Sequence, residues 1–235
     1  MGKFLYPQIS TTYVLEEILS YPEKADPLEV SHYQKILDEM GIKLVPKGTS
    51  EIHGIEVLGK GFTSIVILGE MGGARVALKI QRKDANRKNL KKEAYFLKLL
   101  EPFNAAPKLI TLRKRILIME FVDGFRLKDF EFERSHVLRF LRIANTLDKL
   151  SIDHSQLQGG KHLLVSKDSK CYIIDFEKAG FRTPRNLTSL VSELFLRSGY
   201  ERTREIFSYN EERLKKALRG YKEKKNLEVV LRVLG

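Results

Sequence analysis

The feature that most constrains the fold of this chain is a change in the spacing of its apolar residues. Between Ile52 and Val122 the sequence consists of short runs of Ile, Val and Leu bounded by glycines, a pattern typical of β-strands. The segments expected to form strands are residues 54–59, 63–70, 74–80, 107–112 and 115–122. The Gly72-Gly73 pair predicts a hairpin, and within this region helical spacing is confined to 84–100. The pattern therefore indicates a small antiparallel sheet with one helix.

Helical spacing of apolar residues flanks this region on both sides. On the N-terminal side it predicts one helix within Thr11 to Tyr21 and a second that Asp26 can cap, so residues 1–50 are expected to form a helical extension. After Asp123 the chain is expected to be mostly helical, apart from a hairpin that ends at Asp175. The helices expected there are 135–150, 187–197, 202–208 and 211–222. The whole pattern predicts an α+β fold.

The composition of the 235-residue chain fits a folded globular protein. Its hydrophobic content of 43% suffices for a core, and its longest apolar runs fall far short of the roughly 20 residues that cross a bilayer. We therefore expect a cytoplasmic protein without membrane contact. Cys171 is the single cysteine, which excludes an internal disulfide and a cysteine-based zinc site. The net charge of +12 attracts polyanions such as nucleic acid, acidic proteins or nucleotides without choosing among them.

Two motifs in the expected sheet have the residue types of a phosphate site. Gly59 and Gly61 lie in a turn between strands, where glycines let backbone N–H groups approach a phosphate, although glycines in hairpins usually just make turns. On a following strand, alternation places Ala77 and Lys79 on one face. A lysine among apolar strand residues needs an anionic partner, for which Glu93 is the candidate, unless the lysine lies on a solvated face.

Two later segments could contact a ligand. The strand at 115–122 runs into a break between sheet and helices, where a ligand could meet backbone groups of Glu120 to Val122, or it is simply a core strand. Asp175 follows the apolar residues Ile173 and Ile174. A carboxylate at the end of a strand can bind a metal beyond the strand's tip, or it can cap the next turn.

The order of these features resembles a known family. The chain presents a glycine turn, a strand lysine, a helix glutamate, a strand that leaves the sheet, a histidine-containing loop and Ile174-Asp175-Phe176. This order resembles the protein-kinase-like fold, including the compact RIO-type and other atypical archaeal kinases, over roughly residues 51–180. The resemblance implies two lobes, an N-lobe at 51–122 and a reduced C-lobe at 123–235. It also implies an ATP-dependent phosphotransferase, and foremost an atypical serine/threonine protein kinase.

The resemblance also assigns residues to the nucleotide. Lys79 would contact the α- and β-phosphates of ATP while paired with Glu93, and the Gly59–Gly61 turn would cover the phosphates. Ser64 stands where the family has a third glycine. The other residues counted as nucleotide-binding are Ala77, Met119, Glu120, Phe121 and Val122. Met119 would line the adenine pocket, and Glu120 together with Phe121 or Val122 would offer backbone hydrogen bonds to the base.

The catalytic loop departs from the family pattern. In His154-Ser155-Gln156, Gln156 occupies the place of the catalytic aspartate. Three interpretations stay open. Gln156 orients the attacking hydroxyl without taking its proton, or Asp153 moves in as the base, or the protein is a pseudokinase that binds nucleotide without transfer.

The metal site departs from the pattern as well. By resemblance Asp175 would hold Mg²⁺, and His162 is the nearest counterpart of a metal-binding asparagine, one residue late. A nitrogen ligand suits Mn²⁺ better than Mg²⁺, although a loop histidine can also merely form hydrogen bonds. Lys161 could neutralise charge on the transferring phosphate. Glu177 replaces the glycine of the family's Asp-Phe-Gly.

The acceptor and any macromolecular partner stay open. No Ala-Pro-Glu motif follows Phe181, so the peptide-binding helices of ordinary protein kinases are expected to be reduced. The acceptor is then an unknown protein or a small molecule, and a small-molecule kinase is a further alternative. Basic residues crowd 82–92 and 213–225. They are by default solvated faces, but they could also bind RNA or a ribonucleoprotein, on which the pseudokinase would be a nucleotide-binding scaffold.

Overall fold

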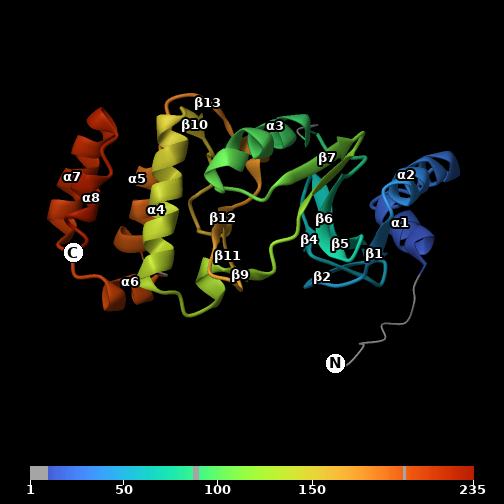
Figure 1. Cartoon of the computed structure of the whole chain (residues 1–235), viewed down its shortest axis with the longest axis horizontal. Coiled ribbons are helices and arrows are strands. Elements are labelled where there is room, and N and C mark those ends of the chain that lie inside the picture. Colours follow the sequence, from blue (N-terminus) through green and yellow to red (C-terminus); the bar gives the residue numbers. More distant parts are fainter. Residues whose placement is uncertain (1–9, 87–89, 198–199) are drawn as a thin grey trace. The chain divides into compact units, whose positions relative to one another are not determined.

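The computed structural model describes residues 10–86, 90–197 and 200–235 (Figure 1). The chain divides into two compact units, of which the first extends to Ala94 and includes Lys108–Phe121. The second comprises Tyr95–Pro107 and the chain from Val122 onward. The α+β class and the antiparallel sheet expected from the sequence are confirmed. Within the described ranges, every helix is too short or too polar to span a membrane.

The first unit is an antiparallel sheet preceded in sequence by two helices. Its elements are α1 (Thr11–Leu19), α2 (Pro27–Glu39), β1 (Ile42–Val45), β2 (Ser50–Ile52), β3 (Ile55–Val57), β4 (Gly59–Lys60), β5 (Ser64–Met71), β6 (Ala74–Gln81), β7 (Leu109–Arg113) and β8 (Ile116–Glu120). The helix α3 (Leu90–Leu100) begins in this unit, and its residues from Tyr95 onward belong to the second. The strand order is β1-β5-β6-β8-β7, and β4 also pairs with β5. Gly72 and Gly73 join β5 to β6 with φ of 57° and 81°, which glycine adopts without strain, so the predicted hairpin is confirmed.

The helices α1 and α2 form where the apolar spacing predicts them. The hydroxyl of Ser10 accepts a hydrogen bond from the N–H of Tyr13 at 3.5 Å, and the carboxylate of Asp26 accepts one from Leu28 at 2.9 Å. Each bond satisfies a backbone donor in the first turn of a helix, which has no partner within the helix itself. Local sequence thus sets the start of both helices.

The segment before residue 50 is not entirely helical, in contrast to the expectation. After α2 the chain forms β1, which pairs with β5. Ile42 and Leu44 are buried and share one hydrophobic core with α1, α2 and the sheet. A strand of only four residues is a weak local signal, and its stability comes from the neighbouring strand and the helices packed on it. Residues 14–44 therefore contribute to the core of the first unit.

The helix expected at 84–100 does not include residues 84–86. Asp84 lies in a turn, α3 is described over Leu90–Leu100, and residues 87–89, which include part of the basic cluster, lie outside the described residues. The guanidinium of Arg82 donates two hydrogen bonds to the carboxylate of Asp84, at 2.9 and 2.6 Å. This contact between side chains two residues apart favours the turn over the first turn of a helix.

The second unit is mainly helical. Its main elements are β9 (Gly124–Arg126), α4 (Arg134–Lys149), β10 (Ile152–Asp153), β11 (Leu163–Ser166), β12 (Cys171–Ile173), β13 (Gly180–Phe181), α5 (Asn186–Val191) with a π-helical turn (Ser192–Leu196), α6 (Glu201–Ile206), α7 (Glu211–Lys224) and α8 (Glu228–Leu231). Two small antiparallel sheets, β12-β11-β9 and β10-β13, lie among these helices. The predicted helices are present with ends shifted by at most two residues, whereas β9, β13 and α8 were not predicted.

Gly124 shows why one of these strands escaped prediction. A Cβ at Gly124 would lie 2.0 Å from the carbonyl oxygen of Val165 on β11, so only glycine allows β9 to approach β11 this closely. The Asp123-Gly124 step looks like a break between segments in the sequence. In the structure it is a position of close strand packing.

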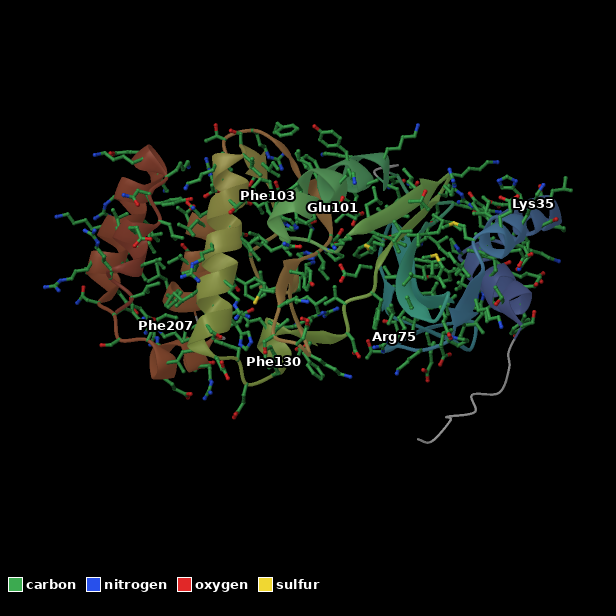
Figure 2. The ribbon with its side chains drawn as sticks, in the orientation of Figure 1. Lys35, Arg75, Glu101, Phe103, Phe130 and Phe207 are labelled. Carbon is green, nitrogen blue, oxygen red and sulfur yellow. The ribbon has the colours of Figure 1, made fainter. Side chains whose placement is uncertain are left out.

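The C-terminal part of the second unit is anchored to α4. The guanidinium of Arg134 lies 4.4 Å from the centre of the ring of Phe207, which is labelled in Figure 2. On α7, the buried hydroxyl of Tyr221 lies 3.0 Å from the amide oxygen of Asn145 on α4. Cys171 on β12 is also buried, and burial raises the pKa of its thiol to about 12, which fits a packing role.

Candidate active site

The lysine and the glutamate singled out in the sequence are in contact inside the first unit. Lys79 lies on β6, the strand between β5 and β8, and Glu93 lies on α3. Nζ of Lys79 stands 2.7 Å from Oε2 of Glu93, and the two side chains are 6% and 1% exposed. Taking two charges out of water costs several kcal/mol per ion, which the contact offsets only in part. A buried ion pair of this kind adds little net stability to the fold, so its presence favours a functional role for the ammonium group of Lys79.

The glycine turn has glycines that its own packing does not require. Gly59 lies in β4, and the N–H of Gly61 donates to the carbonyl of Ser64 at 2.8 Å. A Cβ at Gly59 would meet no described atom within 4 Å, and one at Gly61 would meet only the Ser64 carbonyl, at 3.2 Å. Phe62 at the tip is 96% exposed. Neither glycine has a positive φ like that of Gly72, so the backbone conformation does not require glycine at these two positions. The geometry instead fits a turn in which the absence of side chains lets a ligand approach the backbone closely.

Two residues expected near the adenine base lie opposite each other. Ala77 on β6 and Met119 on β8 are partners across the sheet. The N–H of Glu120 donates to the carbonyl of Lys108 at 2.9 Å, so this N–H already belongs to a protein hydrogen bond. Phe121 and Val122 follow β8 outside any strand. The guanidinium of Arg75, labelled in Figure 2, lies 5.1 Å from the centre of the Phe121 ring.

The loop that begins at His154 belongs to the second unit and is held by buried hydrogen bonds. The N–H of His154 donates to the side-chain oxygen of Asn186 at 2.8 Å. Its Nε2 lies 3.0 Å from the carbonyl oxygen of Ile174, the residue before Asp175. His154 is fully buried, and its ring lies edge-on to Phe176 with centres 4.8 Å apart. The loop and the turn at Asp175 are therefore fixed to each other.

Asp153 is engaged by neighbouring side chains. Its Oδ2 accepts hydrogen bonds of 2.6 Å from both the Ser155 hydroxyl and Nε of Arg182, and Arg182 also contacts that hydroxyl. Burial by itself would raise the pKa of Asp153, but these hydrogen bonds and the positive charge of Arg182 outweigh it and hold the pKa below its usual value. A carboxylate with a lowered pKa is a weaker base, so the contacts favour a structural role over proton transfer.

Gln156 has a side-chain oxygen with capacity for another hydrogen bond. The residue is partly buried, and its Oε1 is buried and has no hydrogen-bond partner among the described residues. A buried amide oxygen without a partner is unfavourable by about 1–3 kcal/mol. Such an oxygen can accept a hydrogen bond from a hydroxyl that enters the loop.

The two candidate metal ligands lie near each other. Nδ1 of His162 stands 3.8 Å from Oδ2 of Asp175, and the His162 ring packs against that of His154 with centres 5.5 Å apart. Asp175 has φ of 68°, a left-handed conformation that is uncommon outside glycine and is frequent at functional turns. Lys161, next to His162, is exposed. The chain thus brings one imidazole and one carboxylate together.

The pair of Asp175 and His162 is too small to form a metal centre by itself. No group of three or more His, Cys, Asp or Glu side chains is placed to hold a metal in the described part of the chain. A cation bound by Asp175 and His162 would need further oxygen ligands, which phosphates and water supply for Mg²⁺ at nucleotide sites. An imidazole ligand would favour Mn²⁺ over Mg²⁺. The pair does not fit a stand-alone metal centre.

One loop contact was missed by the sequence reasoning. Gly160 has φ of 60°, and a Cβ there would lie 1.6 Å from the hydroxyl of Tyr200. Tyr200 is buried, its hydroxyl has no partner among the described residues, and burial next to Glu193 and Asp129 raises its pKa to about 12. The Gly159-Gly160 pair was visible in the sequence, but nothing local to it indicated a distant tyrosine.

Further residues near the loop were also missed, namely Asp148, Arg182, Asn186 and Tyr221. Asp148 did carry a signal, because it lies seven residues after Leu141 on the apolar face of the predicted helix. A carboxylate at an apolar position must find hydrogen-bond donors from elsewhere in the fold. The sequence did not indicate which residues supply them.

Comparison with known proteins relates the chain to a family and to an archaeal protein. A family model described as the RIO domain matches residues 71–189, which include Lys79, Glu93, His154 and Asp175 but not the glycine turn. An uncharacterized protein of Methanocaldococcus jannaschii is 39% identical to this chain over 84 residues. The matched stretch is 33% of this chain and 72% of that relative.

Proposed function

Because the chain belongs to the RIO domain family of atypical kinase-like proteins, we propose that it is an ATP-dependent phosphotransferase. More specifically, we propose an atypical serine/threonine protein kinase that transfers the γ-phosphate of ATP to a protein hydroxyl. The observation that carries the proposal is the buried contact of 2.7 Å between Lys79 and Glu93. An ammonium held in place by a carboxylate on the neighbouring helix is the arrangement that positions nucleotide phosphates in kinases.

The first unit supplies groups that suit the phosphates and the base. Lys79 would donate to the α- and β-phosphates, and the turn at Gly59 and Gly61 leaves room for backbone donors to approach them. Ser64 is the buried first residue of β5, beside that turn. Ala77 and Met119 offer small and flexible apolar surface suited to a base.

The second unit supplies groups that suit a divalent cation and the acceptor. Asp175, with His162 beside it, would hold Mg²⁺ or Mn²⁺ together with phosphate oxygens. Such a cation, when bound, neutralises charge on the phosphates during transfer. Lys161 is exposed next to His162 and can add positive charge.

Gln156 is the residue best suited to orient the acceptor. Its Oε1 would accept a hydrogen bond from the acceptor hydroxyl as the new O–P bond forms and the bond from phosphorus to the bridging oxygen of ADP breaks. Because an amide is not a base, the hydroxyl proton would pass to an oxygen of the transferred phosphoryl group. In a loose phosphoryl transition state, positioning and electrostatic stabilisation supply most of the rate enhancement, so a carboxylate base is not essential. The engagement of Asp153 by Arg182 makes Asp153 the weaker candidate for a base.

A second candidate function is a nucleotide-binding scaffold without phosphoryl transfer, docked on RNA or a ribonucleoprotein. The observation in its favour is that the loop offers a glutamine at the catalytic position while its nearby carboxylate, Asp153, is held by Arg182. The exposed basic residues of α7 would provide the docking charge.

The test is turnover of γ-labelled ATP by the purified full chain with Mg²⁺ or Mn²⁺, measured as labelled protein and released phosphate. Lys79→Met and Asp175→Asn should each lower turnover by about 10²–10³-fold. The matched controls are Lys98→Met, an exposed lysine on α3, and Asp168→Asn, an exposed turn carboxylate in the second unit. ATP binding by calorimetry without turnover in the wild type would favour the scaffold. Absence of both ATP binding and ATP turnover in the wild type would refute both functions.

A further inference from the structure

A chain of buried polar side chains connects α7 to the loop that carries Gln156. On α7, the hydroxyl of Tyr221 lies 2.9 Å from Oδ2 of Asp148 on α4. On the other side of that carboxylate, the side-chain amide of Asn186, the first residue of α5, donates to Oδ1 of Asp148 at 2.8 Å. Tyr221, Asp148 and Asn186 are 0%, 3% and 2% exposed. We call these three residues the relay.

Asp148 is the centre of the relay. Its Oδ1 also accepts from the backbone N–H of Asn186 at 3.0 Å, and its Oδ2 accepts from that of Leu187 at 3.3 Å. The carboxylate of α4 thereby binds two backbone donors in the first turn of α5 that have no partner within that helix. Its hydrogen-bond partners among the described residues are neutral, so the buried charge depends on the full set of donors. Loss of one donor should therefore loosen the others.

Asn186 connects Asp148 to the backbone of the loop that carries Gln156. Its side-chain amide donates to the carbonyl of Ile152 at 2.6 Å as well as to Asp148, and its side-chain oxygen accepts from the N–H of His154 at 2.8 Å. Both donors and the acceptor of the amide are thus in use. The loop backbone is held on both sides of Asp153, immediately before Ser155 and Gln156.

The same loop is coupled to the candidate metal ligand. Nε2 of His154 lies 3.0 Å from the carbonyl oxygen of Ile174, and Asp175 follows in its left-handed conformation. A displacement of the His154 backbone would therefore also displace Gln156 and Asp175. Position errors of about 1 Å cost reactions that depend on orientation as much as about 10²-fold in rate.

We propose that Tyr221, Asp148 and Asn186 are positioning residues for phosphoryl transfer, through which α7 holds the loop from Ile152 to Gln156 in its active geometry. This inference rests on the proposed phosphotransferase function. It gives α7, which the sequence presents as a basic amphipathic helix, a role on its buried side. None of the three residues need contact the nucleotide or the acceptor.

The first experiment compares Tyr221→Phe with Tyr209→Phe in the full chain. Each change removes one tyrosine hydroxyl of the second unit, and the hydroxyl of Tyr209 donates to the Phe195 carbonyl at 2.6 Å, outside the relay. The first readout, hydrogen exchange of a peptide covering 152–157, needs no turnover. Tyr221→Phe should speed exchange of the His154 amide about two- to tenfold, as expected for loss of one hydrogen bond, whereas Tyr209→Phe should leave it unchanged.

The second readout is kinetic. Tyr221→Phe should lower kcat for γ-phosphate transfer by a similar factor while the Kd for ATP stays within about twofold of wild type, since no nucleotide contact is removed. Tyr209→Phe should keep the wild-type kcat. A merely structural tyrosine would lower the midpoint of thermal unfolding in both variants without separating their kcat values.

A rescue variant tests the contact between Asp148 and Asn186. Asn186→Asp places two carboxylates at the 2.8 Å contact and should lower kcat by more than Tyr221→Phe. Adding Asp148→Asn restores a donor to that contact and should recover part of the lost kcat. The recovery is partial because a carboxylate at 186 has no donor for the Ile152 carbonyl.

The outcomes separate the inference from the proposed function. Wild-type turnover with identical exchange and kcat in the two tyrosine variants, and no recovery in the double variant, would overturn the relay and leave the function standing. Absence of ATP turnover in the wild type would overturn the function and with it the catalytic part of the inference. Faster His154 exchange in Tyr221→Phe alone would then still identify Tyr221 as the residue that holds the loop.

Discussion

At the scale of single residues, the buried Lys79–Glu93 pair leads to a prediction about stability. Glu93→Ala would leave the ammonium of Lys79 buried without this carboxylate, and loss of one partner of a buried pair costs about 3–5 kcal/mol. Denaturant unfolding of the two proteins measures the difference. Glu101→Ala, which breaks the exposed pair with Lys98, is the control and should cost at most about 1 kcal/mol. Equal losses in the two variants would mean that burial of Lys79 is not what makes Glu93 important.

Asp153 leads to a prediction about pH. Burial alone would raise its pKa, but its hydrogen bonds with Ser155 and Arg182 and the charge of Arg182 outweigh burial and hold the pKa below its value in the unfolded chain. The folded state therefore binds this proton less readily than the unfolded state does. The stability contributed by the pair is present above the unfolded pKa and is lost as the pH falls through the lower, folded pKa. The difference in the free energy of unfolding between the wild type and Asp153→Asn should be constant above about pH 5 and should shrink in stronger acid. A difference that grows as the pH falls would contradict the assignment.

Gly160 leads to a prediction about packing. Gly160→Ala places a methyl group 1.6 Å from the Tyr200 hydroxyl, and overpacking of this kind costs about 1–3 kcal/mol in addition to backbone strain. Gly159→Ala is a close control, because Gly159 also has positive φ, of 79°, but a Cβ there would meet no described atom within 4 Å. Thermal unfolding and turnover of the two variants isolate the contact with Tyr200. Similar behaviour of both would show that strain alone determines the effect.

At the scale of elements, β1 makes the N-terminal segment part of the first unit. Leu44 is 4% exposed and packs in the core shared by the helices α1 and α2 and the sheet. Leu44→Ala should therefore destabilise the protein by about 2–5 kcal/mol. Lys43→Ala changes the exposed face of the same strand and should have little effect. Denaturant unfolding distinguishes this from a loosely attached extension, for which both changes would be nearly neutral.

At the scale of the whole molecule, the net charge of +12 makes the alternative of RNA binding testable. Binding of a single-stranded RNA, followed by fluorescence anisotropy, should weaken steeply with salt, because counterions are released on binding. Lys216→Glu with Arg219→Glu reverses two exposed charges on α7, and Lys35→Glu with Lys47→Glu reverses two in the first unit. A site on α7 predicts that only the first pair reduces both affinity and its salt dependence. Equal effects would indicate attraction by net charge alone.

The sequence alone determined the order and type of most elements and the central pair of the candidate site. The spacing of apolar residues distinguishes strands from helices locally, which is why α1, α2, β5, β6 and α4 lie close to where they were predicted. The contact between Lys79 and Glu93 was predictable because a lysine on a buried strand requires a carboxylate partner, and Glu93 lies on the next predicted helix.

The tertiary structure decided everything that depends on partners distant in the chain. The strands β1 and β9 exist because a neighbouring strand satisfies their backbone groups, and four or three residues carry too weak a pattern of their own. The engagement of Asp153 by Arg182, 29 residues away, changed the ranking of the candidate bases. The relay joins residues 73 and 38 positions apart, Tyr221 with Asp148 and Asp148 with Asn186. Hydrogen bonds over such separations leave no periodic trace in a sequence, because folding alone brings the donors and acceptors together.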